Sequence, residues 1–108
     1  MSELTTKAKL AIESADAILI GASNGLSISE GYNIFADNDM FRRQFGDFRE
    51  RYGIHSVLDG VFAKHMPKED YKKYISRLVQ LWVDDYTPSA VMTDLRAIVS
   101  DKPCFVLT

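Results

Sequence analysis

Apolar and polar positions follow a helical period over most of this 108-residue chain. Near its start, small and aliphatic residues share one face of a helix over residues 4–15: Leu4, Ala8, Ala11, Ile12 and Ala15. Two short apolar runs depart from this pattern, AILIG at 17–21 and CFVL at 104–107. Both runs are too short for helices and predict buried strands.

An aromatic stripe marks the middle of the chain. Phe41, Phe45, Phe48 and Tyr52 recur at i, i+4, i+7 and i+11. Aromatic residues at this spacing predict a helix that contributes to a core rather than to the wall of a ligand site. Gly46 interrupts the stripe and predicts a break into two short helices.

Capping residues and prolines indicate where the helices begin and end. Asn38 or Asp39 can cap the aromatic helix, and Gly53 can end it. Ser56 and Pro67 are start signals for two further helices. Three apolar sets support these two helices and a last one: Val57, Leu58, Val61 and Phe62; Tyr71, Tyr74, Ile75, Leu78, Leu81 and Trp82; and Val91, Met92, Leu95, Ile98 and Val99. Two strands separated by mostly helical chain predict an α/β fold in which the strands pair in parallel.

The first predicted strand runs into a glycine-containing turn at residues 21–31. Gly21 and Gly25 flank small and polar residues, and a segment that can begin a helix follows. Unpaired N–H groups and the helix dipole can hold an anion at such a turn, which favours a phosphate-bearing ligand such as a dinucleotide. The spacing is not G-x-G-x-x-G and no Walker lysine follows, so a tight turn whose glycines only relieve backbone strain stays open.

The residues of this turn resemble the N-terminal signature of the sirtuin (Sir2) family, G-A-G-[IV]-S-x-x-x-G-I-P-D-F-R. The triplet GLS at 25–27 matches G-[IV]-S, Gly31 matches the later glycine, and Phe35 falls on the phenylalanine of D-F-R. The bacterial sirtuins linked to macrodomains, with a version close to I-G-A-G-A-G-L-S, are more similar still. The stretch FRRQFGDF at 41–48 also resembles that subgroup, and the resemblance covers residues 12–62.

This resemblance implies an NAD-binding site made by the turn and the segment after it. Backbone N–H groups would wrap the pyrophosphate, and Ser23, Asn24 and Ser27 would add side-chain donors. A mobile loop from Gly31 would carry Phe35, which would shield the reacting carbon from water. The residues assigned to NAD are Gly21, Ala22, Ser23, Asn24, Gly25, Leu26, Ser27, Gly31 and Phe35.

The resemblance also implies an activity and a partner. In whole enzymes of this family, nicotinamide is lost from NAD and ADP-ribose is transferred to a protein or acyl acceptor. Asn33, Ile34 and Ala36 stand where the signature has proline, aspartate and arginine. Because that arginine helps to hold the cofactor in deacylases, its absence favours the protein ADP-ribosylation associated with the macrodomain-linked group over lysine deacylation. The expected partner is therefore a protein acceptor.

The same resemblance implies a partial Rossmann-like fold. Residues 1–108 would be the N-terminal part of a single Sir2-like NAD-binding domain, with a helical module at about 37–100. A two-stranded parallel sheet leaves two open edges and is unstable by itself. We therefore expect a fragment without the family's N-x-D catalytic segment, inactive alone and able to form homo-oligomers through the open edge. The catalytic residue stays unknown.

Composition narrows the classes of partner and location. A formal net charge of −2 argues against a nucleic-acid partner. Arg42, Arg43, Arg49 and Arg51 alternate with acidic residues, which predicts a solvated helix face more readily than a phosphate contact. No apolar run approaches ~18 residues and the first residues contain no signal-like segment, so we expect a cytoplasmic protein without a membrane span. The single cysteine, Cys104, predicts a small buried hydrophobe.

The two histidines offer little by their sequence positions. His55 and His65 have no acidic or cysteine partner at ligand spacing, so no metal site is predicted. Neither histidine shows the pattern of a base with an orienting partner. Two other functions stay open: a non-catalytic module that binds NAD or ADP-ribose, and a helical protein-interaction domain whose glycine turn is only a turn.

Overall fold

The computed structural model describes residues 2–108, and the chain divides into two units. The first unit contains the N-terminal segment up to Leu26 together with Pro88–Thr108. The second unit is the segment between them, Ser27–Thr87. The chain therefore leaves the first unit once and returns to it once.

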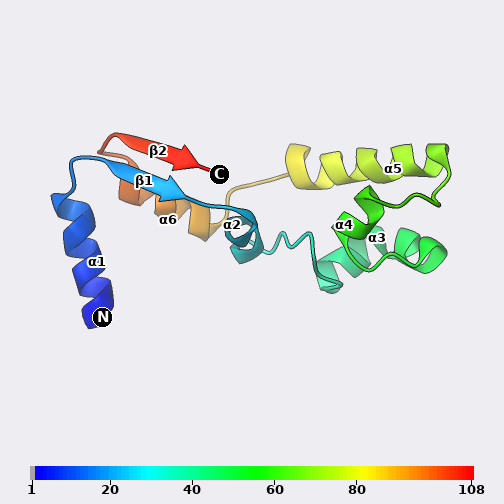
Figure 1. Ribbon diagram of the computed structural model, residues 1–108, viewed down its shortest axis with the longest axis horizontal. Helices are drawn as coiled ribbons and strands as arrows, with labels where there is room; N and C mark the ends of the chain where they lie inside the picture. Colours follow the sequence, from blue (N-terminus) through cyan, green and yellow to red (C-terminus); the bar gives the residue numbers. More distant parts are fainter. Residues whose placement is uncertain (1) are drawn as a thin grey trace. The chain divides into compact units, whose positions relative to one another are not determined.

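A parallel pair of strands organises the first unit (Figure 1). β1 pairs with β2 in a register that runs from Ile18 opposite Cys104 to Gly21 opposite Leu107. The prediction of a mostly helical α/β chain with two parallel strands is confirmed. The elements of this unit are α1 (Glu3–Ser14), β1 (Ile18–Gly21), α6 (Ala90–Val99) and β2 (Cys104–Leu107), and the short helix α2 (Asn24–Ser29) follows β1 and extends into the second unit.

Both ends of α1 are satisfied by side chains. At its beginning, the Ser2 hydroxyl accepts the Thr5 N–H at 3.1 Å. At its end, the Lys102 ammonium donates to the carbonyls of Glu13 and Ala15, both at 2.7 Å, and to that of Ile12. A cation placed on the last carbonyls of a helix satisfies their unpaired acceptors and complements the helix dipole. Lys102 thereby ties α1 to the turn that precedes β2.

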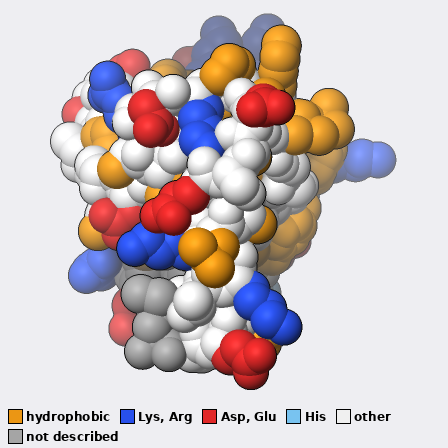
Figure 2. Space-filling model, turned by 90° about the vertical axis from the view of Figure 1, so that its left-hand side faces the viewer, with side chains coloured by type: hydrophobic (Ala, Val, Ile, Leu, Met, Phe, Trp, Pro, Cys, Tyr) orange, Lys and Arg blue, Asp and Glu red, His pale blue; other side chains and the backbone are white. Residues whose placement is uncertain are grey.

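The strands are more exposed than the sequence predicts. Leu19 of β1 is 70% exposed and Phe105 of β2 is 74% exposed. Cys104 is also exposed, so the prediction that it is a buried hydrophobe is wrong. Figure 2, which views the molecule from the left-hand side of Figure 1, shows hydrophobic side chains at the surface beside acidic and basic ones. An apolar run indicates that a strand can be buried, but burial requires other elements to pack against the sheet. This sheet has two strands, and their side chains remain largely exposed.

The second unit contains the buried core. Its elements are α3 (Asp39–Tyr52), α4 (Val57–Val61), α5 (Lys68–Val79) and a π-helical turn, Gln80–Asp84. The aromatic stripe is confirmed as core, since Phe41, Phe45 and Phe48 are all buried. Among residues 2–108, the buried apolar residues are Phe41, Phe45, Phe48, Ile54, Val57, Met66 and Tyr74.

Most predicted helix boundaries are confirmed. Asn38 caps α3, because its side-chain oxygen accepts the Phe41 N–H at 2.9 Å. The break in α3 occurs at Phe45 (φ −131°, ψ 20°), one residue before the predicted Gly46. Gly53 ends the helix with φ 67°, a conformation that favours glycine. Ser56 caps α4 in the same way as Asn38 caps α3, through the N–H of the third residue after it.

Two tyrosines join α4 to α5. Tyr74 is completely buried, and its hydroxyl donates to the Val57 carbonyl at 2.7 Å. The Tyr71 hydroxyl donates to the Val61 carbonyl at 2.9 Å. The Tyr74 ring lies so close to Gly60 that a Cβ at this position would overlap it. Only glycine leaves room for this contact.

The two ends of the second unit lie close together. The Tyr86 hydroxyl donates to the Glu30 carboxylate at 2.8 and 2.9 Å. The Tyr32 ring contacts the rings of Trp82 and Tyr86, with centroids 5.1 and 5.7 Å apart. These contacts therefore join the first residues of the helical unit to its last.

Within residues 2–108, every helix is too short or too polar to cross a membrane.

The contact between Gly60 and Tyr74 predicts an asymmetry between two glycines. Gly60→Ala should lower the free energy of unfolding by about 2 kcal/mol, because the added methyl group must displace a buried ring. Gly46→Ala is the matched control, since a Cβ there meets nothing within 4 Å and alanine favours a helix. Denaturant unfolding measures both variants. Equal stabilities for Gly60→Ala and the wild type would contradict this packing.

Candidate functional site

The glycine turn lies at the carboxyl ends of the two parallel strands. β1 ends at Gly21, and the Ala22 N–H donates to the Leu107 carbonyl at 3.0 Å, so the pairing continues one residue past β1. α2 begins at Asn24, two residues later. The predicted order of strand, turn and helix is confirmed. Ligands of open α/β sheets bind at this edge of a sheet.

Three backbone amides of the turn are available to a ligand. The N–H groups of Ser23, Asn24 and Gly25 have no acceptor within the part of the chain that the structure describes, and all three residues are exposed. Helix geometry leaves the first N–H groups of a helix without internal partners. The neighbouring amides are used, since Ala22 donates to β2 and Leu26 donates to the Ser23 carbonyl at 3.0 Å.

The glycines of the turn differ in what they do for the backbone. Gly31 has φ 94°, which disfavours any other residue, and it ends α2. The N–H groups of Gly31 and Tyr32 bond the Ile28 and Ser27 carbonyls, which is the usual glycine end of a helix. Gly21 and Gly25 have no positive φ, and a Cβ at either would meet nothing within 4 Å. Relief of backbone strain therefore explains Gly31 and neither Gly21 nor Gly25.

The segment that carries Phe35 is held at several points. The Phe35 N–H donates to the Asn33 side chain at 3.0 Å, and the Ile34 carbonyl accepts the Leu58 N–H at 3.0 Å. Phe35 itself remains 53% exposed. The nine residues assigned to NAD are divided between the two units, with 21–26 in the first and Ser27, Gly31 and Phe35 in the second. The structure defines each group by itself.

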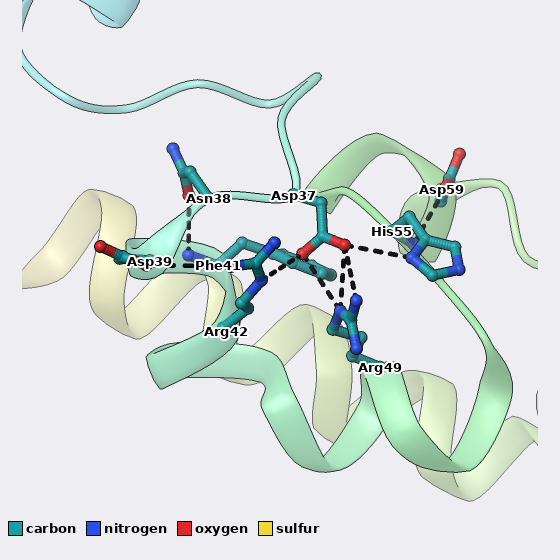
Figure 3. A network of polar contacts seen from close by, with 8 residues as sticks. All are labelled: Asp37, Asn38, Asp39, Phe41, Arg42, Arg49, His55 and Asp59. Atoms are coloured by element: carbon teal, nitrogen blue, oxygen red, sulfur yellow. Dashed lines mark hydrogen bonds and ion pairs between the residues drawn. The ribbon is translucent and has the colours of Figure 1, made fainter.

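Two residues beyond Phe35, Asp37 is the centre of a polar cluster (Figure 3). Its carboxylate accepts two hydrogen bonds from Arg49 Nε, both at 3.1 Å, and one from Arg49 Nη2 at 2.8 Å. Arg42 Nε donates to it at 3.0 Å, and His55 Nδ1 lies 3.1 Å from Oδ2. The cluster joins the Phe35 segment to α3 and to the turn before α4.

These contacts extend one sequence prediction and correct another. The arginine face is partly exposed, at 53% for Arg42 and 32% for Arg49, and both guanidinium groups bind Asp37. His55 does have an orienting carboxylate, although its side chain is 62% exposed. The sequence hid both contacts because the partners lie five, twelve and eighteen residues apart. Asp59 also contacts His55, because its carboxylate accepts the backbone N–H of His55 at 3.0 Å (Figure 3).

Charge explains the protonation state of Asp37. The hydrogen bond from Arg49 is the largest influence, and those from His55 and Arg42 add to it. Together they outweigh partial desolvation and hold the pKa of the Asp37 carboxyl far below its usual range. The same pair raises the pKa of Arg49. Neither in this cluster nor elsewhere in residues 2–108 do three His, Cys, Asp or Glu side chains gather in a way that could hold a metal ion.

Comparison with known proteins gives a similarity that bears on function. No family model matches the chain. The chain is 29% identical over 111 residues to a protein named protein ADP-ribosyltransferase in Staphylococcus aureus strain Mu50. The alignment covers the whole of this chain and 35% of that protein. The chain thus spans about a third of the length of this relative.

The lowered pKa predicts a pH-dependent stability. Asp37→Asn should lower the melting temperature at pH 7, because a neutral amide cannot bind two arginines as a carboxylate does. A carboxyl whose pKa is lowered by folding stabilises the protein above its unfolded pKa of about 4. The difference between wild type and variant should therefore shrink as the pH falls below about 4.

Thermal melts between pH 7 and pH 2 test this expectation. Asp39→Asn is the matched control, because Asp39 is 94% exposed and lies 3.9 Å from a single arginine, Arg42. Its melting temperature should follow that of the wild type at every pH. A pH-independent difference for Asp37→Asn would show that the carboxylate charge is not what stabilises the cluster.

Proposed function

We propose that this chain forms part of the NAD-binding region of a protein ADP-ribosyltransferase of the sirtuin (Sir2) type. The similarity to the Staphylococcus aureus protein supports a role related to ADP-ribosyl transfer. The match of residues 25–35 to the sirtuin signature supports the finer assignment. In this proposal the chain belongs to a partial Rossmann-like domain, and the helical unit Ser27–Thr87 is its helical module.

One observation carries the proposal. Gly21 and Gly25 stand where neither backbone conformation nor packing requires glycine, next to three exposed amides without acceptors among the described residues. Glycine at such positions allows a ligand to approach the backbone closely, and clustered N–H groups suit an anion. The pyrophosphate of NAD meets both conditions.

The residues of the turn would then have distinct roles. The N–H groups of Ser23, Asn24 and Gly25 would donate to the pyrophosphate, and the side chains of Ser23, Asn24 and Ser27 would add donors. Gly21 would admit the cofactor without a steric barrier. The amides of Ala22 and Leu26, which already have acceptors, would hold the shape of the turn.

The second group of residues would act at the nicotinamide end. Gly31 would set the direction in which the segment leaves α2, and Phe35 would exclude water from the reacting carbon. The Asp37 cluster would hold that segment in place through Arg49. NAD would supply the ADP-ribosyl group, with nicotinamide as the leaving group and a protein nucleophile as the acceptor. The absence of an arginine at Ala36 favours this transfer over lysine deacylation.

Backbone amide shifts test the proposal directly. In ¹H–¹⁵N correlation spectra of the protein, NAD and ADP-ribose should both shift the amides of residues 23–26. Gly25→Leu should weaken binding at least about tenfold, because the side chain would fill the space that the pyrophosphate needs. Gly46→Leu is the matched control, since it adds the same side chain to another open helical position.

Helix content and melting temperature should be nearly equal in the two variants, which separates lost binding from lost folding. Saturating NAD that leaves residues 23–26 unshifted would overturn the proposal. Binding that survives Gly25→Leu would move the site elsewhere in the chain.

A further inference from the structure

An exposed phenylalanine lies at the end of α4. Phe62 is 72% exposed, while its neighbours Val61 and Ala63 pack against the core. A single exposed apolar side chain is ordinary on a protein surface. Its surroundings decide whether it has a role, and here they are concave and charged.

Phe62 stands between two hollows of the second unit. The first has a volume of about 390 Å³ and lies toward Gly53 and Leu58. The second has a volume of about 420 Å³ and lies toward Met66 and Tyr71. Phe62, Ala63 and Lys64 line both, and we call the two hollows together the Phe62 groove. Each is large enough for a side chain of a partner.

The backbone under Phe62 is fixed. Its N–H donates to the Leu58 carbonyl at 3.1 Å, and the Ala63 N–H donates to the Gly60 carbonyl at 3.3 Å. On the other side, the Tyr71 hydroxyl bonds the Val61 carbonyl. An aromatic side chain on an ordered backbone loses less conformational entropy when a partner binds than one on a mobile segment does.

Charge indicates which partner fits. Lys64 and Lys68 line the second hollow, no acidic side chain lines it, and neither lysine forms an ion pair within residues 2–108. By contrast, Arg49, Arg51 and Arg77 of the same unit are each paired with an aspartate. The second hollow is therefore a locally basic surface on a chain whose net charge is −2, whereas Asp59 lines the first.

We propose that the Phe62 groove docks an acidic segment of a partner protein that carries an aliphatic side chain among its carboxylates. The aliphatic side chain would pack on Phe62 inside a hollow, where aromatic anchors contribute most of the binding energy. The carboxylates would pair with Lys64 and Lys68 and steer the approach. This proposal is independent of NAD binding, since its residues differ from those of the glycine turn.

Short peptides test the groove. The acetylated peptide DELED should bind, and its binding should shift the amides of residues 58–68 in ¹H–¹⁵N spectra. Replacing its leucine by serine (DESED), or its acids by bases (KRLRK), should each weaken binding about tenfold or more. About 1 M salt should also weaken it, because salt screens exposed charges.

Variants of the protein separate this groove from general stickiness. Phe62→Ser should weaken DELED binding about tenfold or more. Phe105→Ser, which changes a phenylalanine with a similar exposure of 74%, should not. Lys64→Glu combined with Lys68→Glu should abolish DELED binding and allow KRLRK to bind instead.

Three results would overturn the proposal. The first is that DELED leaves residues 58–68 unshifted. The second is that KRLRK binds the wild type as well as DELED does. The third is that the same amides shift with protein concentration in the absence of peptide, which would make a second copy of the chain the occupant.

Discussion

The packing of the Tyr74 ring against Gly60 is the contact on which the second unit depends. The ring is fully buried, its hydroxyl satisfies the Val57 carbonyl, and the missing Cβ at Gly60 makes the approach possible. Phe45 and Phe48 of α3 then pack on the same ring, with centroids 5.0 and 5.2 Å away. One side chain thereby brings α3, α4 and α5 around a common centre. A buried hydroxyl without an acceptor would cost more than the bond itself contributes, so the fit specifies one arrangement.

The surface features of functional interest are built on this core. Asp37 is bound by Arg49 of α3, the helix whose buried face carries the phenylalanines. Phe62 follows α4, whose Val57 carbonyl and Gly60 lie under Tyr74. Apolar and polar contacts thus have different roles in this unit. The core determines where each helix lies, and charge-assisted hydrogen bonds, which are directional, then fix the segment that presents Phe35.

The first unit is stabilised differently from the second, which contains the buried core. Its strands pair in register, yet Leu19 and Phe105 remain largely exposed, so the apolar sequence of the sheet is not matched by burial within the described residues. Polar contacts stabilise the periphery of this unit, above all the Lys102 ammonium on the last carbonyls of α1. The glycine turn at the end of β1 keeps its exposed amides in this setting, and its chemistry suits a phosphate group more than a protein side chain.

The sequence by itself determined the features that depend on neighbouring residues. The helix ends could be predicted, because Asn38, Gly53 and Ser56 bond backbone groups three or four residues away. The buried aromatic face of α3 could be predicted, because the spacing of its phenylalanines follows the helical period. The strand, turn and helix of the candidate site could be predicted for the same reason. Tertiary structure alone decided the meeting of Asp37 with Arg49 and His55, the need for glycine at position 60 and the exposure of Cys104. These depend on contacts between residues far apart in the chain, which no local pattern records.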